Sequence, residues 1–147
     1  MRLSTRGRYA TRALLELAQN PAGSTSTLKE IALKQNISLR YLEHLITPLI
    51  AAGIVRTTRG PKGGISMARS PAEVRLSEII QLLEGSIAPV ECVDSPELCT
   101  RSKSCASRDI WCEVKKAVNN VLESVTLQDL IERQREKEQP AQSMYYV

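Results

Sequence analysis

Apolar residues recur every three or four positions through most of this chain, which is the spacing of helices with one buried face. Four stretches of this kind precede residue 86, and they lie at Tyr9–Ala18, Ile31–Leu33, Leu39–Ile46 and Leu76–Leu83. Ser4 or Thr5 can cap the first, and Gly85 follows the last. The pattern predicts a helix-rich chain.

A helix, a tight turn and a second helix are predicted in the first third. Thr27 and Glu30 have the spacing of a capping box, and Asn36 can adopt the left-handed conformation that ends a short helix. Ser38 can cap the next helix, in which a kink or restart is expected near Thr47, because Pro48 removes one backbone hydrogen bond and crowds the preceding turn.

Two strand-like runs follow, at Ile54–Thr58 and Ile65–Ala68. The segment between them is rich in glycine and proline and carries Arg59 and Lys62, so it predicts a β-hairpin with two cations near its tip. A hairpin after a helix-turn-helix is typical of a winged helix, in which the hairpin is the wing.

The second half begins with an irregular segment that holds three cysteines, followed by a long apolar stripe over Ile110–Val125. Thr126 and Asp129 then open a short last helix, and Gln134–Gln142 reads as a frayed tail. The predicted division is a DNA-binding head at 1–86, a cysteine-rich loop at 87–108, a dimerisation helix with a short last helix at 109–138, and a flexible tail at 139–147.

Charge separates the two halves. Residues 1–70 contain 11 Lys/Arg against 3 Asp/Glu, whereas residues 71–147 contain 9 against 13. With 3% aromatic residues and no Phe, the core must be aliphatic, which favours packed helices. A basic head suits binding to phosphates, and ordinary solvated faces are the alternative.

The residues predicted to contact DNA lie on the second helix of the motif, on the hairpin and at the start of the chain. They are Arg2, Arg8, Ser38, Arg40, Tyr41, Glu43, His44, Arg59 and Lys62. The first residues of a recognition helix reach base edges in the major groove, and cations of a wing reach phosphates or the minor groove. His44 as a metal ligand is an alternative, but the sequence offers it no neighbouring ligand.

Four cysteines in a chain with no apparent signal peptide or membrane span indicate metal or redox chemistry in the cytoplasm, where thiols stay reduced. Cys92, Cys99, Cys105 and Cys112 are separated by six, five and six residues, without the C-x-x-C pattern of many zinc sites. An iron–sulfur cluster fits better than zinc, because a flexible segment can fold around it. Cys112 is either a further ligand or a small residue of the long helix. No catalytic constellation is evident, so an enzyme is not expected.

Several runs of residues are specific enough to indicate a family. They are Met1–Tyr9 (MRLSTRGRY), Ile37–Glu43 (ISLRYLE), Val55–Gly64 (VRTTRGPKGG) and Ser124–Leu130 (SVTLQDL). With the cysteines, they resemble the IscR-like family of winged-helix repressors over nearly the whole chain.

The resemblance implies a mainly α winged-helix homodimer that binds pseudo-palindromic operators on double-stranded DNA and controls iron–sulfur biogenesis genes. It implies a 2Fe–2S cluster, rather than 4Fe–4S, on Cys92, Cys99 and Cys105, supplied by cluster-assembly proteins. It also implies that Glu43 discriminates operators and that Arg59 touches DNA. The implied dimer contacts are Ile110, Val114, Val118, Val121, Leu122 and Val125.

The chain departs from this pattern at Arg108, where many relatives have a histidine ligand. The fourth ligand therefore stays open among Cys112, a carboxylate (Glu91, Asp94 or Asp109) and a group of the partner subunit. Alternatives for the function are a nitric-oxide or thiol redox-sensing regulator of the same fold and, in another class, an electron-transfer or cluster-carrier protein.

Overall fold

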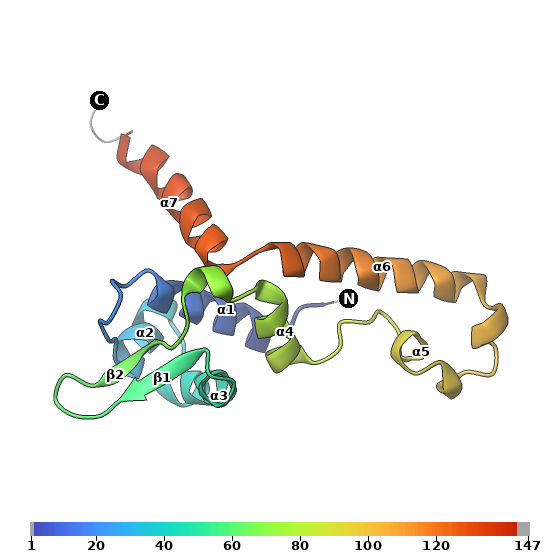
Figure 1. Ribbon diagram of the computed structural model, residues 1–147, viewed down its shortest axis with the longest axis horizontal. Helices are drawn as coiled ribbons and strands as arrows, with labels where there is room; N and C mark the ends of the chain where they lie inside the picture. Colours follow the sequence, from blue (N-terminus) through green and yellow to red (C-terminus); the bar gives the residue numbers. More distant parts are fainter. Residues whose placement is uncertain (1, 144–147) are drawn as a thin grey trace.

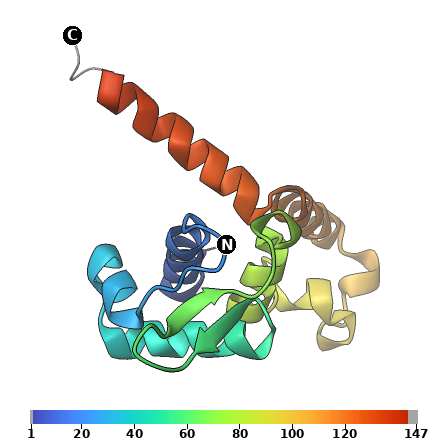
Figure 2. The same ribbon diagram turned by 60° about the vertical axis from the view of Figure 1, so that its left-hand side comes forward.

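A computed structural model describes residues 2–143, and the side chains of residues 2–139. It is mainly helical with one two-stranded hairpin, as the sequence predicts (Figures 1 and 2). The helices are α1 (Thr5–Ala18), α2 (Leu28–Gln35), α3 (Leu39–Ala51), α4 (Leu76–Glu84), α5 (Glu91–Asp94), α6 (Ala106–Ser124) and α7 (Leu127–Ser143). The strands are β1 (Val55–Thr58) and β2 (Gly64–Met67), and short 3₁₀ turns are η1 (Pro71–Glu73), η2 (Pro96–Leu98) and η3 (Ser102–Ser104).

The helix-turn-helix forms through the predicted caps. Thr27 and Glu30 make both hydrogen bonds of a capping box at the start of α2. Asn36 ends α2 with a φ of 54°, in the left-handed region, and the hydroxyl of Ser38 accepts a hydrogen bond from the backbone of Tyr41 at 3.1 Å. Local hydrogen bonds therefore set the turn between α2 and α3.

The helix does not restart at Pro48, because α3 continues from Leu39 to Ala51 with Pro48 inside it, and a kink near Thr47 stays a prediction. The hydroxyl of Thr47 donates to the carbonyl of Glu43 at 2.8 Å in the turn before the proline. Leu45, before Pro48 in the sequence, and Leu49, after it, are both buried. Packing of the apolar face outweighs the local cost of the proline.

The hairpin is held against the head by the linker between α1 and α2. β1 and β2 pair antiparallel, with Val55 opposite Met67, and Ile65 forms a further bridge with Ser26. Gly64 has a φ of 154°, and a side chain there would overlap the carbonyl oxygen of Ser26. Glycine is therefore required where the wing meets this linker.

The end of α6 is attached to the start of α4. Leu76 donates its backbone N–H to the carbonyl of Val125 at 2.8 Å, and Leu127 donates to Val74 at 2.9 Å. Val125 is 9% exposed and Leu127 is fully buried. Val125 is thus nearly buried within its own chain, through a long-range pairing that the sequence does not reveal, and its role in a dimer contact stays a prediction.

The last helix is longer than predicted. It runs from Leu127 to Ser143, so the segment expected to fray, Gln134–Gln142, is helical. Hydrogen bonds four residues apart, such as that from Gln134 to Glu138 at 2.9 Å, support its exposed surface. Of the predicted flexible tail, residues 139–143 are helical and residues 144–147 lie outside the described part of the chain. Over residues 2–143, no helix is sufficiently long and apolar to cross a membrane.

Candidate DNA-binding face and cysteine loop

One face of α3 is polar and exposed, and the opposite face is in the core. Arg40, Glu43 and His44 are exposed, and three- and four-residue spacing places them on the same side of the helix. Leu42 and Leu45, on the other side, are at most 1% exposed. Ser38, which caps α3, is also exposed. The side chains predicted to reach bases are thus free of contacts with the core.

Tyr41 differs from the other residues predicted to contact DNA. Its ring is half-buried and meets the ring of Tyr9 edge-on, with the centroids 6.1 Å apart. Its hydroxyl is buried and has no hydrogen-bond partner among the described residues. In this position Tyr41 connects α3 to α1, and its contact with DNA stays a prediction.

The wing presents its two cations to solvent. Arg59 and Lys62 are both exposed, in the turn between β1 and β2. The carbonyl of Lys62 accepts a hydrogen bond from the hydroxyl of Thr25 at 3.0 Å, which fixes one side of this turn to the head. The cations therefore extend from an anchored hairpin and can meet a phosphate backbone.

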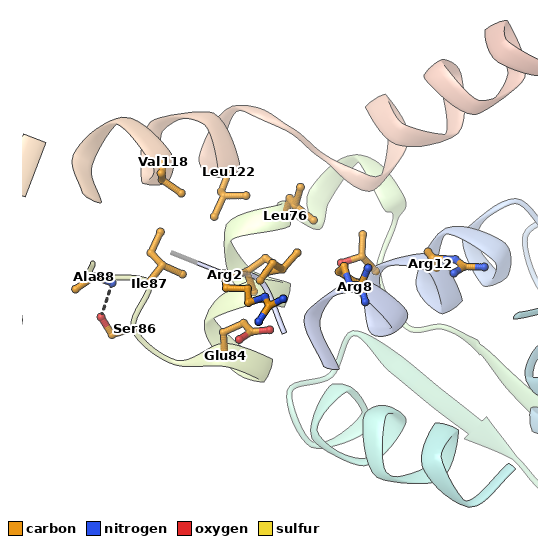
Figure 3. A pocket seen from close by; sticks show the side chains of 13 residues that line it. Arg2, Arg8, Arg12, Leu76, Glu84, Ser86, Ile87, Ala88, Val118 and Leu122 are labelled. Atoms are coloured by element: carbon orange, nitrogen blue, oxygen red, sulfur yellow. Dashed lines mark hydrogen bonds between the residues drawn. The ribbon is translucent and has the colours of Figure 1, made fainter. Parts of the chain in front are cut away.

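Arg2 and Arg8 lie in a groove between α1, α4 and α6 (Figure 3). The groove has a volume of about 680 Å³, and its floor and walls include Leu76, Val118 and Leu122. None of its lining residues belongs to α3 or to the hairpin. Both arginines thus lie beside the groove rather than beside α3 or the hairpin, and their contact with DNA stays a prediction.

Arg12 is a further residue of this groove that the sequence pattern did not single out. Its guanidinium lies 5.3 Å from the centre of the Tyr9 ring, and that of Arg8 lies 6.0 Å from it. Both distances are within the range of a cation–π contact. The four-residue spacing of Arg8 and Arg12 on one helix face was the signal that could have indicated it.

The cysteines lie on a segment that returns from the end of α4 to the start of α6. Cys92 is in α5, Cys99 follows η2, and Cys105 is the residue before the first turn of α6. All four thiols are free and half-buried. Within residues 2–143, no three Cys, His, Asp or Glu side chains are gathered closely enough to hold a metal ion. The segment therefore has suitable sulfur ligands for an iron–sulfur cluster but keeps them apart.

Cys105 is the thiol whose pKa departs from its ordinary value. Its sulfur lies 3.2 Å from the hydroxyl of Ser107, and this hydrogen bond, followed by that from the backbone of Arg108, lowers the pKa of the thiol. Both groups belong to the first turn of α6, where unpaired N–H groups favour a negative charge.

The candidates for a fourth ligand have different surroundings. The carboxylate of Asp94 accepts hydrogen bonds from Lys115 and Ser86, and these lower its pKa. Arg108 donates from Nε to the carbonyl of Cys92 at 2.9 Å, which connects α5 to the start of α6.

Cys112 lies two helical turns into α6, about 10 Å along the axis from Cys105. Glu91 and Asp109 are exposed. The identity of a fourth ligand stays a prediction.

α6 has a side that its own chain leaves uncovered. None of its residues is buried, although it is 19 residues long and amphipathic. Val118 and Leu122 are half-buried toward the groove, whereas Ile110 and Val121 are 51% and 62% exposed. Val114 is half-buried. Val121 and Ile110 thus form part of an exposed apolar stripe.

Residues 3–133 match the profile of the Rrf2 family, described as an iron-dependent transcriptional regulator. The chain belongs to the Rrf2 family. Because this family consists of transcriptional regulators, the chain is a DNA-binding regulator and not an enzyme.

Two kinds of Rrf2 regulator are among the similar proteins. CymR of Bacillus subtilis is 39% identical over 130 residues, which cover 88% of this chain and 89% of CymR. Its solved structure, described as that of the global cysteine regulator, has a TM-score of 0.76 at 37% identity and covers 90% of this chain and 98% of that one. IscR of T. potens has a TM-score of 0.77 at 34% identity, covering 93% and 90%. The predicted resemblance to IscR-like winged-helix repressors is confirmed, and the chain is similar to CymR regulators as well as to IscR regulators.

Proposed function

We propose that this Rrf2 regulator acts as a homodimer on pseudo-palindromic operators in the cytoplasm. The uncovered stripe of α6 supports this proposal, because an amphipathic helix of 19 residues without a buried residue requires a partner surface. A second copy is the partner that twofold symmetry favours. The two α3 helices would then meet half-sites about 34–36 Å apart.

Each head would place α3 in the major groove. Arg40 can pair with guanine, Glu43 can accept from cytosine, and His44 can hydrogen-bond to a base edge. Arg59 and Lys62 would contact phosphates or the minor groove. The exposure of all five side chains supports these roles.

We further propose that the regulator senses iron–sulfur status through a 2Fe–2S cluster on Cys92, Cys99 and Cys105, and controls genes of iron–sulfur biogenesis. The observation that supports it most is the placement of three half-buried thiols on the segment that joins the head to α6. A bound cluster would supply a state that depends on iron, sulfide and oxidants. Because the thiols lie apart, the segment between Glu91 and Cys105 must close to bind it.

The test is the content of iron and acid-labile sulfide in protein purified without oxygen. We expect about two of each per chain in the wild type. Cys92→Ala, Cys99→Ala and Cys105→Ala should lose both, whereas Cys112→Ala should keep them if Cys112 is only a residue of α6. Retention in all three loop variants would exclude this ligand set.

A thiol-based regulator is the second candidate. It is favoured by the separation of the thiols and by the likeness to CymR, for which an oxidised form has been solved in Staphylococcus aureus. In that case no labile sulfide would be found under any reconstitution. DNA binding would instead respond to a mild oxidant and recover with a dithiol reductant.

A further inference from the structure

The carboxylate of Glu84 connects the last turn of α4 to the first turn of α1. Its Oε1 accepts hydrogen bonds from the backbone N–H groups of Ser4 and Gly7, both at 3.1 Å, and from the hydroxyl of Ser4. N–H groups at the start of a helix have no partner within the helix, and a carboxylate there also favours the helix dipole. The hydroxyl of Ser4, the residue before α1, also accepts from the Gly7 N–H at 3.4 Å, so α1 has its own local cap and a second one from a residue about 80 positions later in the chain.

Gly7 makes room for this carboxylate. A β-carbon at Gly7 would lie 2.5 Å from Oε1 of Glu84 and 3.1 Å from a methyl carbon of Leu3. Gly7 has no positive φ that would require glycine, and glycine is a poor residue within a helix. The close approach of Glu84 is the structural reason for glycine at this position.

The segment that follows Glu84 runs from α4 to α5, the helix that contains Cys92 (Figure 1). Gly85 has a φ of 73°, and the hydroxyl of Ser86 donates to the carboxylate of Asp94, which also pairs with Lys115 of α6. Asp94 is two residues after Cys92. Any rearrangement that brings the thiols together must move this segment against the fixed end of α4.

α1, whose first turn contacts Glu84, also packs against α3, the proposed recognition helix. Tyr9, two residues after Gly7, packs edge-on against Tyr41 of α3. A displacement of the first turns of α1 would thus be transmitted to the helix that bears Arg40 and Glu43.

We propose that Glu84 is a positioning residue that couples the state of the cysteine segment to the DNA-binding head, an inference that rests on the proposed function. The Glu84 cap and the Ser86–Asp94 hydrogen bond are two fixed points on either side of Gly85. Closure of the segment would pull on the cap of α1 and change the orientation of α3. An interaction present in only one of two states is what gives a coupling between sites.

The experiment compares the Kd for DNA in two states of the full chain: cluster-loaded, and after removal of the cluster by chelation. The probe is a duplex selected from a random pool by the loaded wild type. We expect the two wild-type Kd values to differ roughly 5- to 150-fold, the usual range of coupling. In Glu84→Ala and Gly7→Ala the ratio should fall to within about twofold of one. Iron and sulfide content should not change.

Gly7→Ala keeps residue Glu84 but displaces its carboxylate from the start of α1, because the new β-carbon would lie 2.5 Å from Oε1 of Glu84. Glu73→Ala, at an exposed carboxylate of η1, is the matched control and should keep the wild-type ratio. A wild-type ratio in both Glu84→Ala and Gly7→Ala would overturn the inference. So would an equal loss of affinity in both states, which indicates a purely structural role. A wild type without iron and sulfide would instead refute the proposed function and, with it, this coupling.

Discussion

Replacement of Leu127 by alanine should destabilise the attachment of α6 and α7 to the head. The side chain of Leu127 is fully buried in the core, and its backbone N–H donates to Val74 at 2.9 Å. Truncation of a buried leucine costs about 2–5 kcal/mol, because it removes apolar packing and leaves a cavity. At about 2–4 °C per kcal/mol for a chain of this size, the melting temperature should fall by roughly 4–20 °C.

The measurement is thermal unfolding by circular dichroism at one fixed protein concentration, since a dimer melts at a temperature that depends on concentration. Leu33→Ala is the matched control, because Leu33 is also helical but 82% exposed, and such changes usually stay within about 0.5 kcal/mol. Equal losses of stability in the two variants would refute the packing described for Leu127.

Three further predictions concern the wing, the dimer and pH. Arg59→Ala and Lys62→Ala should each weaken binding to all DNA sequences. Each should also reduce the steepness of log K against log salt by about 0.9 for every phosphate that is no longer neutralised. An unchanged slope would show that these two side chains do not contact phosphates. Val121→Asp should sediment as a monomer whose head is still folded. A dimer that persists in this variant would show that the exposed stripe of α6 is not the dimer interface. The N–H and hydroxyl of Thr126 lower the pKa of Asp129, so this carboxylate stabilises the fold above its ordinary pKa and the contribution disappears as pH falls. Melting of Asp129→Asn should therefore depend less on pH below about pH 4 than melting of the wild type.

The local elements of the head could be predicted because their signals are short-range. Thr27 and Glu30 are three residues apart, and Asn36 and Ser38 mark the turn without any distant contact. Glycine and proline in the turn after β1 similarly indicated the hairpin. Capping and turn preferences depend on neighbouring residues, which the sequence displays directly.

The parts that could not be predicted depend on distant contacts. Val125 has the spacing of a dimer contact, but pairing with Leu76 buries it in its own chain. α3 does not restart at Pro48, and the next residue, Leu49, is buried in the core. No short-range pattern shows that Glu84 caps α1.

The cysteine segment falls between these cases. Its residue types indicated sulfur chemistry, and the structure places all three predicted ligands on the segment before α6. Their spacing did not show that the three thiols lie apart in the described chain, or that Asp94 beside them pairs with Lys115 of α6.

The most direct measurement of regulation by a cluster is the DNA affinity of the wild type and of Cys99→Ala, each purified without oxygen, before and after chelation of iron. Binding should be steeply weaker at moderate than at low salt in both proteins if, as proposed, cations of the head neutralise phosphates. Chelation should change the affinity of the wild type and leave that of Cys99→Ala unchanged. Equal affinities of the wild type before and after removal of iron would contradict regulation by a cluster on the cysteine segment.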